Sequence, residues 1–221
     1  MSGRSAVVTC CGSGRELGML HKYGIKLTAT DLTIEQLSDF VRDKIVERAE
    51  IQNAERLSYA DDSFDYGFVY AGLHHLAHPH AGLCELMRTG REAAIFIEPQ
   101  DSLLHAITRM LGRTGPDFEP AGNYVYRWKR REVEKIAMSA HAHSFAVKTY
   151  FLPVLMFMRD ITGWKKKLFQ FGFDVANLVL SRTGNLFICM IFKRPPTSEQ
   201  IVYLKKAGYS YVPLSHRYPD L

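Results

Sequence analysis

The stretch that decides the fold covers residues 6–14 and reads AVVTCCGSG. Residues 6–10 are mostly apolar and β-prone, which is typical of a buried strand. Gly12 and Gly14 then allow the backbone to turn sharply and a ligand to approach the main chain closely. The next residues, 15–23, have the pattern of a helix. The first amides of such a helix, together with its dipole, suit a carboxylate or a phosphate.

Segments typical of strands and of helices alternate through the first half of the chain. The predicted strands are residues 6–10, 25–30, 50–54, 64–71 and 93–98, and the predicted helices are residues 15–23, 33–46 and 80–88. Strands separated by helices imply right-handed crossovers and a mostly parallel sheet. Because such sheets bind ligands at the carboxyl ends of their strands, we expect the distinctive residues to meet at one edge.

The second half has a less regular pattern. It predicts a helix at residues 131–140, partly helical structure at 162–182, and strands at 144–151 and 186–193. If both strands join the sheet, the last one is expected to lie antiparallel between its neighbours. The Pro195-Pro196 pair interrupts the pattern. We therefore expect residues 1–194 to form one domain and residues 195–221 to form a C-terminal tail with at most one short helix.

Asp31 follows Gly12 by 19 residues, directly after the next predicted strand. A carboxylate in that place accepts hydrogen bonds from both hydroxyls of a ribose, so the pair predicts a ligand that contains a nucleoside. The simpler alternative is a glycine turn and an Asp that caps a helix. A dinucleotide would need a third glycine where Leu17 stands, which disfavours that ligand and leaves S-adenosylmethionine as the other class.

Six short stretches, in order and with their spacing, carry a specific resemblance. They are residues 10–16 (CCGSGRE), 30–33 (TDLT), 53–57 (NAERL), 62–65 (DSFD), 72–76 (GLHHL) and 85–88 (ELMR). Residues 6–99 resemble the class I S-adenosylmethionine-dependent methyltransferases of the small-molecule group. The resemblance implies a Rossmann-like, doubly wound, three-layer α/β/α fold. Its seven-stranded sheet would be mostly parallel with an antiparallel last strand, which here would be residues 186–193.

The resemblance also implies a cofactor, S-adenosylmethionine, and its product, S-adenosylhomocysteine. The glycine turn would hold the methionine portion, Asp31 the ribose, and Leu32 would pack on the adenine. Asn53, Ala54 and Glu55 would lie around the adenine ring, and the main-chain carbonyls of Ala71 and Gly72 would approach the ammonium group. The glycine turn consists of Cys10, Cys11, Gly12, Ser13 and Gly14.

The chain departs from the family pattern in two places. The family usually has an acidic residue two places before its first glycine, where this chain has Val8, and a glycine where it has Cys10. The first change removes an anchor for the ammonium group, and the second adds a side chain where the ligand passes. Relatives usually carry a helical lid before the first strand, so the lid is expected to be short or missing here.

Two adjacent histidines, His74 and His75, follow the fourth predicted strand. Histidine titrates in the range that a general base needs, so we expect one of them to accept a proton from the substrate, and we favour His75. The alternative is a histidine that only packs or caps the next helix. Residues 98–101 are expected to contact the substrate. The predicted reaction is in-line methyl transfer to an O or N atom of a small molecule.

Other functions stay open at this point. The departures at Val8 and Cys10 and the short lid favour a non-catalytic, cofactor-binding scaffold protein. Basic clusters at residues 127–131 and 165–167 are compatible with a nucleic-acid methyltransferase, although solvated helix faces explain them more simply. A nicotinamide oxidoreductase is disfavoured by Leu17.

The composition is that of a globular protein, with 47% hydrophobic and 23% charged residues and a net charge of +5. The apolar runs are too short to cross a bilayer, and we predict no secretory signal, no membrane span and no nucleic-acid partner. Four cysteines without a CxxC pair predict free thiols in the cytoplasm and no metal site. The oligomeric state stays open, with a homodimer as one alternative.

Overall fold

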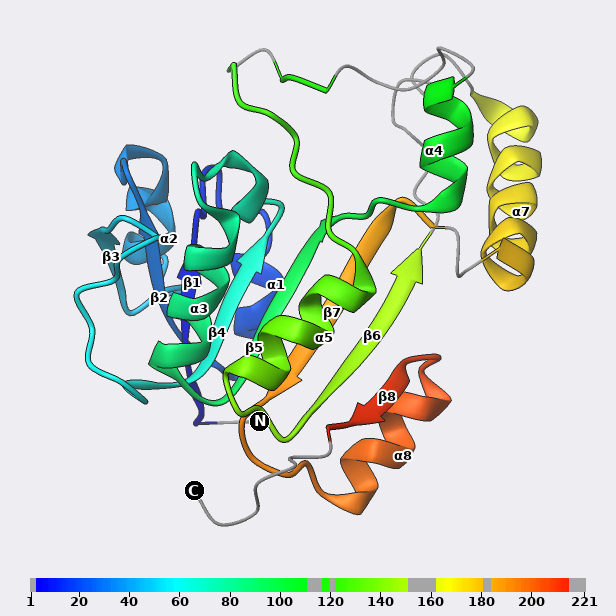
Figure 1. The fold of residues 1–221 in the computed structure, drawn as a ribbon. Helices are drawn as coiled ribbons and strands as arrows, with labels where there is room; N and C mark the ends of the chain where they lie inside the picture. Colours follow the sequence, from blue (N-terminus) through cyan, green and yellow to red (C-terminus); the bar gives the residue numbers. More distant parts are fainter. Residues whose placement is uncertain (1–2, 111–116, 120–121, 151–161, 181–183, 215–221) are drawn as a thin grey trace.

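The computed structural model of the protein describes residues 3–110, 117–119, 122–150, 162–180 and 184–214. A twisted sheet forms its centre, and helices cover both faces (Figure 1). The strands are β1 (Ser5–Thr9), β2 (Lys26–Asp31), β3 (Arg48–Ile51), β4 (Phe64–Tyr70), β5 (Gly90–Pro99), β6 (Ser144–Tyr150), β7 (Leu186–Phe192) and β8 (Ser210–Pro213).

The strand order is β3-β2-β1-β4-β5-β7-β6-β8. Strands β1 to β5 are parallel, and β7 lies antiparallel between β5 and β6. The predicted Rossmann-like class is therefore confirmed, and so is the antiparallel strand between two neighbours. The sheet has eight strands instead of the seven expected, because β8 adds to the outer edge of β6 in antiparallel register.

The helices are α1 (Leu17–Lys22), α2 (Ser38–Arg42), α3 (Pro79–Thr89), α4 (Leu103–Met110), α5 (Arg130–Ser139), α7 (Gly163–Leu180) and α8 (Ser198–Lys206). Two short 3₁₀ turns, η1 (Glu35–Leu37) and η2 (Leu73–His75), precede α2 and follow β4. In Figure 1, α3 and α5 cover the near face of the sheet and α1 lies behind it. Among the described residues, none of the helices has the length and hydropathy that a bilayer span needs.

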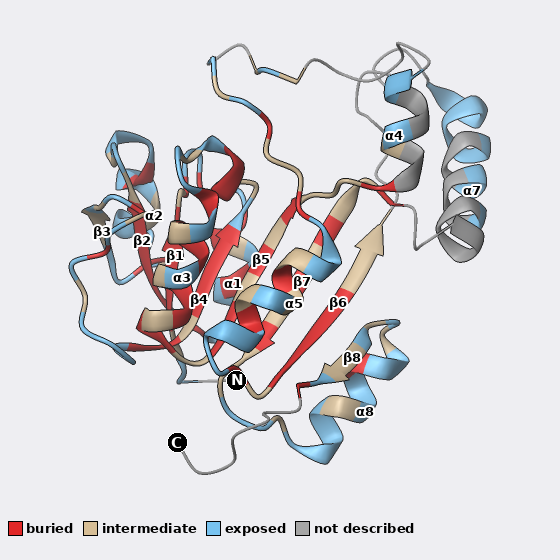
Figure 2. Cartoon of the chain, in the orientation of Figure 1, coloured by how far each residue is buried: buried red, intermediate tan, exposed pale blue. Residues whose placement is uncertain are grey.

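Two apolar clusters form the core, and Figure 2 shows that the buried residues follow the centre of the sheet. One cluster includes Phe96, Phe145 and Phe187, and the fully buried Trp128 packs on Phe96 with a ring distance of 5.3 Å. The other, which includes Leu17, fills the space between α1 and the strands β1 and β2. This packing fixes the strand ends at the upper edge of the sheet, where the glycine turn lies.

The predicted helix at residues 33–46 is wrong in its extent. The chain forms η1 and then α2, and Lys44 adopts a left-handed conformation with φ of 57°. That conformation cannot continue a right-handed helix, so α2 ends at Arg42. The third strand also lies earlier than predicted, at Arg48–Ile51 instead of residues 50–54.

The prediction of a C-terminal tail is wrong for residues 198–213. After the two prolines, Thr197 caps α8 by accepting a hydrogen bond from the amide of Gln200, and Gln200 bonds back to Thr197. This capping box starts a helix of nine residues. Strand β8 then pairs with β6. The segment is part of the sheet, and its last residues, 215–221, lie outside the described part of the chain.

Candidate functional site

A cavity of about 420 Å³ opens at the carboxyl ends of β1, β2 and β4. Its size falls within the range of small-molecule sites. It brings together most of the residues that the resemblance assigns to the cofactor, namely Cys10, Cys11, Gly12, Ser13, Asp31, Leu32, Asn53, Ala54 and Ala71. Sequence reasoning missed the other lining residues apart from His75; these are Arg15, Glu16, Gln52, Tyr70 and Leu76.

The carboxylate of Asp31 is bonded directly to the glycine turn. One of its oxygens accepts a hydrogen bond from the amide of Gly12 at 2.7 Å, and the other accepts one from the amide of Leu32 at 2.7 Å. A carboxylate offers about four acceptor positions, so both oxygens keep capacity for a ligand hydroxyl. Gly12 and Asp31, whose spacing predicts a nucleoside ligand, therefore line the same cavity.

The backbone turns sharply where β1 and β4 end at the cavity. Cys10 has a φ of 54° and Ala71 a φ of 50°, although neither is a glycine. Left-handed backbone at such residues costs on the order of 1–3 kcal/mol and is concentrated at ligand sites. Gly12, with a φ of 48°, adopts the same region without this cost.

Gly72 does not line the cavity. Its amide donates to Glu98 at 2.8 Å, and its carbonyl accepts a hydrogen bond from the amide of His75 at 3.2 Å. A side chain there would lie 2.4 Å from the Cβ of Cys10. The structure therefore gives Gly72 a packing role against Cys10, and its carbonyl is already used within the chain.

Gly14 and Glu55 also lie outside the cavity lining. A Cβ on Gly14 would lie 2.7 Å from the ring of Phe40, so this glycine lets the turn pack on α2. The carboxylate of Glu55 accepts a hydrogen bond from the amide of His78 at 2.7 Å and pairs with its ring at 3.0 Å. These contacts lower the pKa of Glu55 and hold its side chain against the start of α3.

The two cysteines of the turn are neutral thiols. Burial raises the pKa of Cys10 to about 12, and the nearby charges of Asp31 and Glu98 add to the increase. Burial likewise raises the pKa of Cys11, whose thiol donates to the carbonyl of Val8 at 3.1 Å. A nucleophilic cysteine needs the thiolate, so these two residues are suited to packing and not to covalent chemistry.

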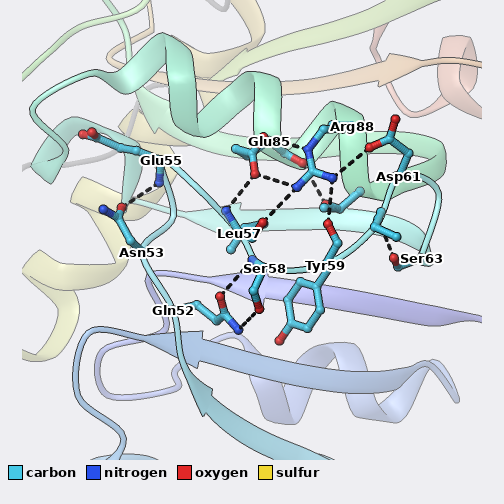
Figure 3. Close-up of polar contacts among 12 residues, drawn as sticks. Gln52, Asn53, Glu55, Leu57, Ser58, Tyr59, Asp61, Ser63, Glu85 and Arg88 are labelled. Atoms are coloured by element: carbon cyan, nitrogen blue, oxygen red, sulfur yellow. Dashed lines mark hydrogen bonds and ion pairs between the residues drawn. The ribbon is translucent and has the colours of Figure 1, made fainter.

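A polar network behind the cavity holds the wall formed by residues 52–54. Figure 3 shows the guanidinium of Arg88 between Glu85, Asp61 and the carbonyls of Leu57 and Tyr59. Glu85 also accepts the amide of Leu57 at 2.7 Å. Because Arg88 and Glu85 lie on α3, the network fixes the segment after β3 against a rigid helix. The cavity wall is preorganised in this way.

His74 is buried and is not part of the cavity lining. Its Nδ1 pairs with Glu98 at 2.7 Å, and Glu98 is fully buried. Burial alone would lower the pKa of His74, but the hydrogen bond and the charge of Glu98, with the charge of Glu119, raise it. The imidazole thus bridges two carboxylates. The prediction that Glu98 contacts the substrate is wrong, since this carboxylate binds His74 and the amides of the loop after β4.

His75, in contrast, is half exposed and lines the cavity. Its Nδ1 lies 3.4 Å from a carboxylate oxygen of Glu119. Glu119 comes from a distant segment that folds back on itself, because its amide donates to the carbonyl of Asn123 at 3.0 Å. Asn123 in turn donates to the carbonyl of His74 at 3.4 Å. No sequence pattern signals this contact, since 44 residues separate Glu119 and His75.

His74, His75 and Glu119 also form a group of metal-ligand types, with ligand atoms within 4.8 Å of one another. Imidazole and carboxylate ligands suit several divalent transition metals. Each of these atoms has a protein partner, however: Glu98 and Glu119 flank His74, and Glu119 faces His75. These contacts within the chain account for the arrangement, and the sequence-based expectation of no metal site stays a prediction.

Comparisons with known proteins identify the fold and the domain. A family model described as "Methyltransferase domain" matches residues 8–98. No curated protein matches the chain. Solved structures that match include an S-adenosylmethionine-dependent methyltransferase of Thermotoga maritima, with 15% identity, a TM-score of 0.57, and coverage of 88% of this chain and 84% of that one.

Two other solved structures have similar scores. The magnesium protoporphyrin IX methyltransferase of Synechocystis, with bound S-adenosylhomocysteine, has 15% identity and a TM-score of 0.57, and the match covers 87% of this chain and 75% of that one. Phosphoethanolamine N-methyltransferase 2 of Haemonchus contortus has 12% identity and a TM-score of 0.55, with 88% and 49% covered. At such identities the likeness concerns the fold.

The residues at the cavity fit the cofactor of this class, since Asp31 keeps free acceptor positions and the glycine turn leaves its main chain accessible. The family model names the domain, and the sheet order with its antiparallel strand gives the fold. Residues 8–98 therefore match a methyltransferase domain, and the fold is that of the class I S-adenosylmethionine-dependent methyltransferases, whose cofactor is S-adenosylmethionine.

Proposed function

We propose that the protein transfers a methyl group to an O or N atom of a small molecule, with the cofactor in the cavity at the ends of β1, β2 and β4. The observation that carries the proposal is the hydrogen bond between Asp31 and Gly12 at the cavity wall. This bond supports the binding of one ligand by both Asp31 and the glycine turn. S-adenosylmethionine supplies the activated methyl group, and the protein supplies position, since holding two reactants in line lowers a barrier by about 7–11 kcal/mol.

Different residues of the cavity would bind different parts of the cofactor. Asp31 would accept hydrogen bonds from the ribose, and residues 52–54 would line the adenine side together with Leu32. The turn at residues 10–13 and the carbonyl of Ala71 would surround the methionine side. The network around Arg88 supports this division, because it holds the adenine wall in place without a ligand.

His75 is the proposed proton acceptor, and His74 is a positioning residue. The carboxylate of Glu119 faces Nδ1 of His75, so a proton on Nδ1 leaves Nε2 free to accept a proton from the substrate. This is the arrangement in which a carboxylate orients a histidine base. His74 is buried behind it and bonded to Glu98, which favours a role in holding the loop that carries His75.

A small acceptor agrees better with the basic residues than a nucleic acid does. In the cluster at residues 127–131, Arg127 pairs with Asp117 at 3.2 Å and Lys129 pairs with Asp101 at 3.0 Å. Cations that are already paired contribute less to the binding of a phosphate backbone, which depends on unpaired Lys and Arg. For Arg127 and Lys129, this pairing supports the small-molecule proposal over the nucleic-acid alternative.

Cofactor binding is tested with the Asp31→Ala variant. We expect the wild-type chain to bind S-adenosylmethionine and S-adenosylhomocysteine in isothermal titration calorimetry. Loss of the hydrogen bonds that the ribose donates to this charged acceptor should weaken the binding of both compounds at least about tenfold in the variant. Asp39→Ala, on the exposed side of α2, is the matched control and should bind as the wild type does. A wild-type chain that binds neither compound at millimolar concentration would exclude the proposal.

The base is tested with the His75→Gln variant. Once an acceptor is found among small hydroxyl and amine compounds, the variant should transfer methyl groups about 10²–10⁴ times more slowly, because the proton has no acceptor. Its affinity for S-adenosylhomocysteine should stay close to that of the wild type. Equal rates in the two proteins would show that His75 only lines the cavity.

A further inference from the structure

Helix α7 carries an apolar stripe that the described part of the chain leaves uncovered. Its four side chains are spaced by four, three and four residues, which places them on one face of the helix. Each is between 45% and 70% exposed, and they are Trp164, Leu168, Phe171 and Val175. Figure 1 shows α7 (yellow) beyond the ends of β6 and β7, away from the helices that cover the sheet. An exposed apolar stripe of this kind marks an interaction surface.

Three consecutive lysines follow Trp164 in the first turn of the same helix. Lys165, Lys166 and Lys167 are exposed and form no ion pair with the described part of the chain. Because a helix turns by about 100° per residue, Lys165 and Lys167 lie on either side of Trp164. The sequence of the helix contains a single acid, Asp174, against these three cations. Positive charge therefore flanks one end of the apolar stripe.

This combination favours a lipid bilayer over a protein partner. Tryptophan is enriched where the acyl chains meet the headgroups, because its ring is apolar and its N–H is polar. Lysine stems lie along apolar surface while their ammonium groups reach the lipid phosphates. The core of a protein interface, in contrast, is depleted of lysine. Unpaired lysines beside the stripe are complementary to a surface that contains anionic lipids.

We propose that α7 docks the protein on a bilayer that contains anionic lipids. The helix lies in the plane of the interface, with the apolar stripe towards the acyl chains and the lysines at the headgroups. Residues 181–185 alone separate α7 from β7, whose first residue, Leu186, pairs with Pro99 at the end of β5. The docking surface is therefore connected to the edge of the sheet where the cavity opens.

Vesicle cosedimentation tests the charge and the stripe separately. The wild-type chain should bind vesicles with phosphatidylglycerol more tightly than vesicles of phosphatidylcholine alone, and added salt should reduce this difference. Replacing Lys165, Lys166 and Lys167 together by Gln should weaken binding to the anionic vesicles about 100-fold. The double variant Leu168→Gln, Phe171→Gln should weaken it at least about tenfold, because two apolar side chains leave the interface.

Helix α8 provides matched controls, because it exposes both residue types. Lys205→Gln with Lys206→Gln controls for the loss of charge, and Val202→Gln with Tyr203→Gln controls for the loss of exposed apolar side chains. Both double variants should bind the vesicles as the wild type does. Circular dichroism spectra equal to that of the wild type show that the variants of α7 are folded.

Tryptophan fluorescence locates the contact, since the chain has two tryptophans and Trp128 is fully buried. Anionic vesicles should shift the emission of the wild type to shorter wavelength, because Trp164 enters the interface. Trp164→Phe should bind the same vesicles without this shift. A shift that persists in Trp164→Phe would contradict the docking of α7.

Two further results would overturn the proposal. One is binding to anionic vesicles that is absent in the wild type or equal in the wild type and the variants of α7. The other is a wild-type dimer in analytical ultracentrifugation that the double variant Leu168→Gln, Phe171→Gln separates into monomers, because the stripe would then contact a second copy of the chain.

Discussion

At the scale of single residues, Ala71 shows how the cavity stores strain. Its φ of 50° lies in the region that glycine adopts freely and other residues avoid. We expect Ala71→Gly to raise the free energy of unfolding by about 1 kcal/mol, because the left-handed penalty disappears. Urea unfolding measures the change. Ala106→Gly, inside α4, is the matched control, and its free energy of unfolding should fall by about 1 kcal/mol. If both variants were less stable than the wild type, the backbone of Ala71 would not be strained.

Site residues could be predicted from the sequence where a local pattern, such as the end of a strand, determines their position. Gly12 follows the end of β1 and Asp31 is the last residue of β2, so their meeting was predictable from spacing alone. Glu119 was not, because its position beside His75 depends on a chain reversal far along the sequence. Glu16 also escaped prediction, since an acid after a glycine turn is ordinary until its burial is known.

At the scale of elements, Asp65 ties the starts of β1 and β4 together at the edge opposite the cavity. Its buried carboxylate accepts the amide of Ser5 at 2.8 Å and pairs with Arg4 at 2.9 Å and with Arg91. Burial alone would raise the pKa of Asp65, but these donors outweigh it and lower the pKa below the ordinary value of 3.8. The carboxylate is therefore more stable in the folded chain than in the unfolded chain.

Asp65→Asn should therefore lower the free energy of unfolding at neutral pH by about 2 kcal/mol, since it removes the charge that strengthens the hydrogen bonds from the half-exposed Arg4 and Arg91. A depressed folded-state pKa gives stability that is complete above the unfolded value and is lost as the pH falls through the folded value. The difference between wild type and variant should thus shrink below about pH 4. Urea unfolding across that range tests this expectation, with Asp39→Asn, at an exposed position of α2, as the control. A difference between wild type and Asp65→Asn that does not depend on pH would refute the linkage.

The elements themselves were predictable wherever a strand is buried on both faces. The apolar runs of β1 and β4 match the predicted strands to within a residue or two, because nearly continuous burial leaves little choice of residue type. Strand β7 also matches, because all seven of its residues are apolar, although only alternate ones are fully buried. The segment at residues 33–46 was not predictable in the same way. Its apolar spacing suits a long helix, but the left-handed Lys44 and the 3₁₀ turn are set by how the chain enters β3.

At the scale of the whole molecule, the sheet separates a binding half from a stabilising half. The cavity lies over β1, β2 and β4, whereas α8 and β8 extend the opposite edge beyond β6. The sequence alone could not reveal this extension. Strand β8 has only four residues, which carry little pattern, and it exists because the edge of β6 offers unpaired backbone groups.

This separation predicts that the far edge affects stability without affecting the cofactor. Leu204 of α8 is 6% exposed, so Leu204→Ala should lower the free energy of unfolding by at least about 2 kcal/mol. The affinity for S-adenosylhomocysteine should stay unchanged, because three strands, β5, β7 and β6, lie between β4 and β8. Tyr203→Ala, on the exposed side of the same helix, should change neither quantity. If Leu204→Ala weakened the ligand in calorimetry at a temperature where the variant is folded, the two halves would be coupled through the sheet, and the cavity would depend on its distant edge.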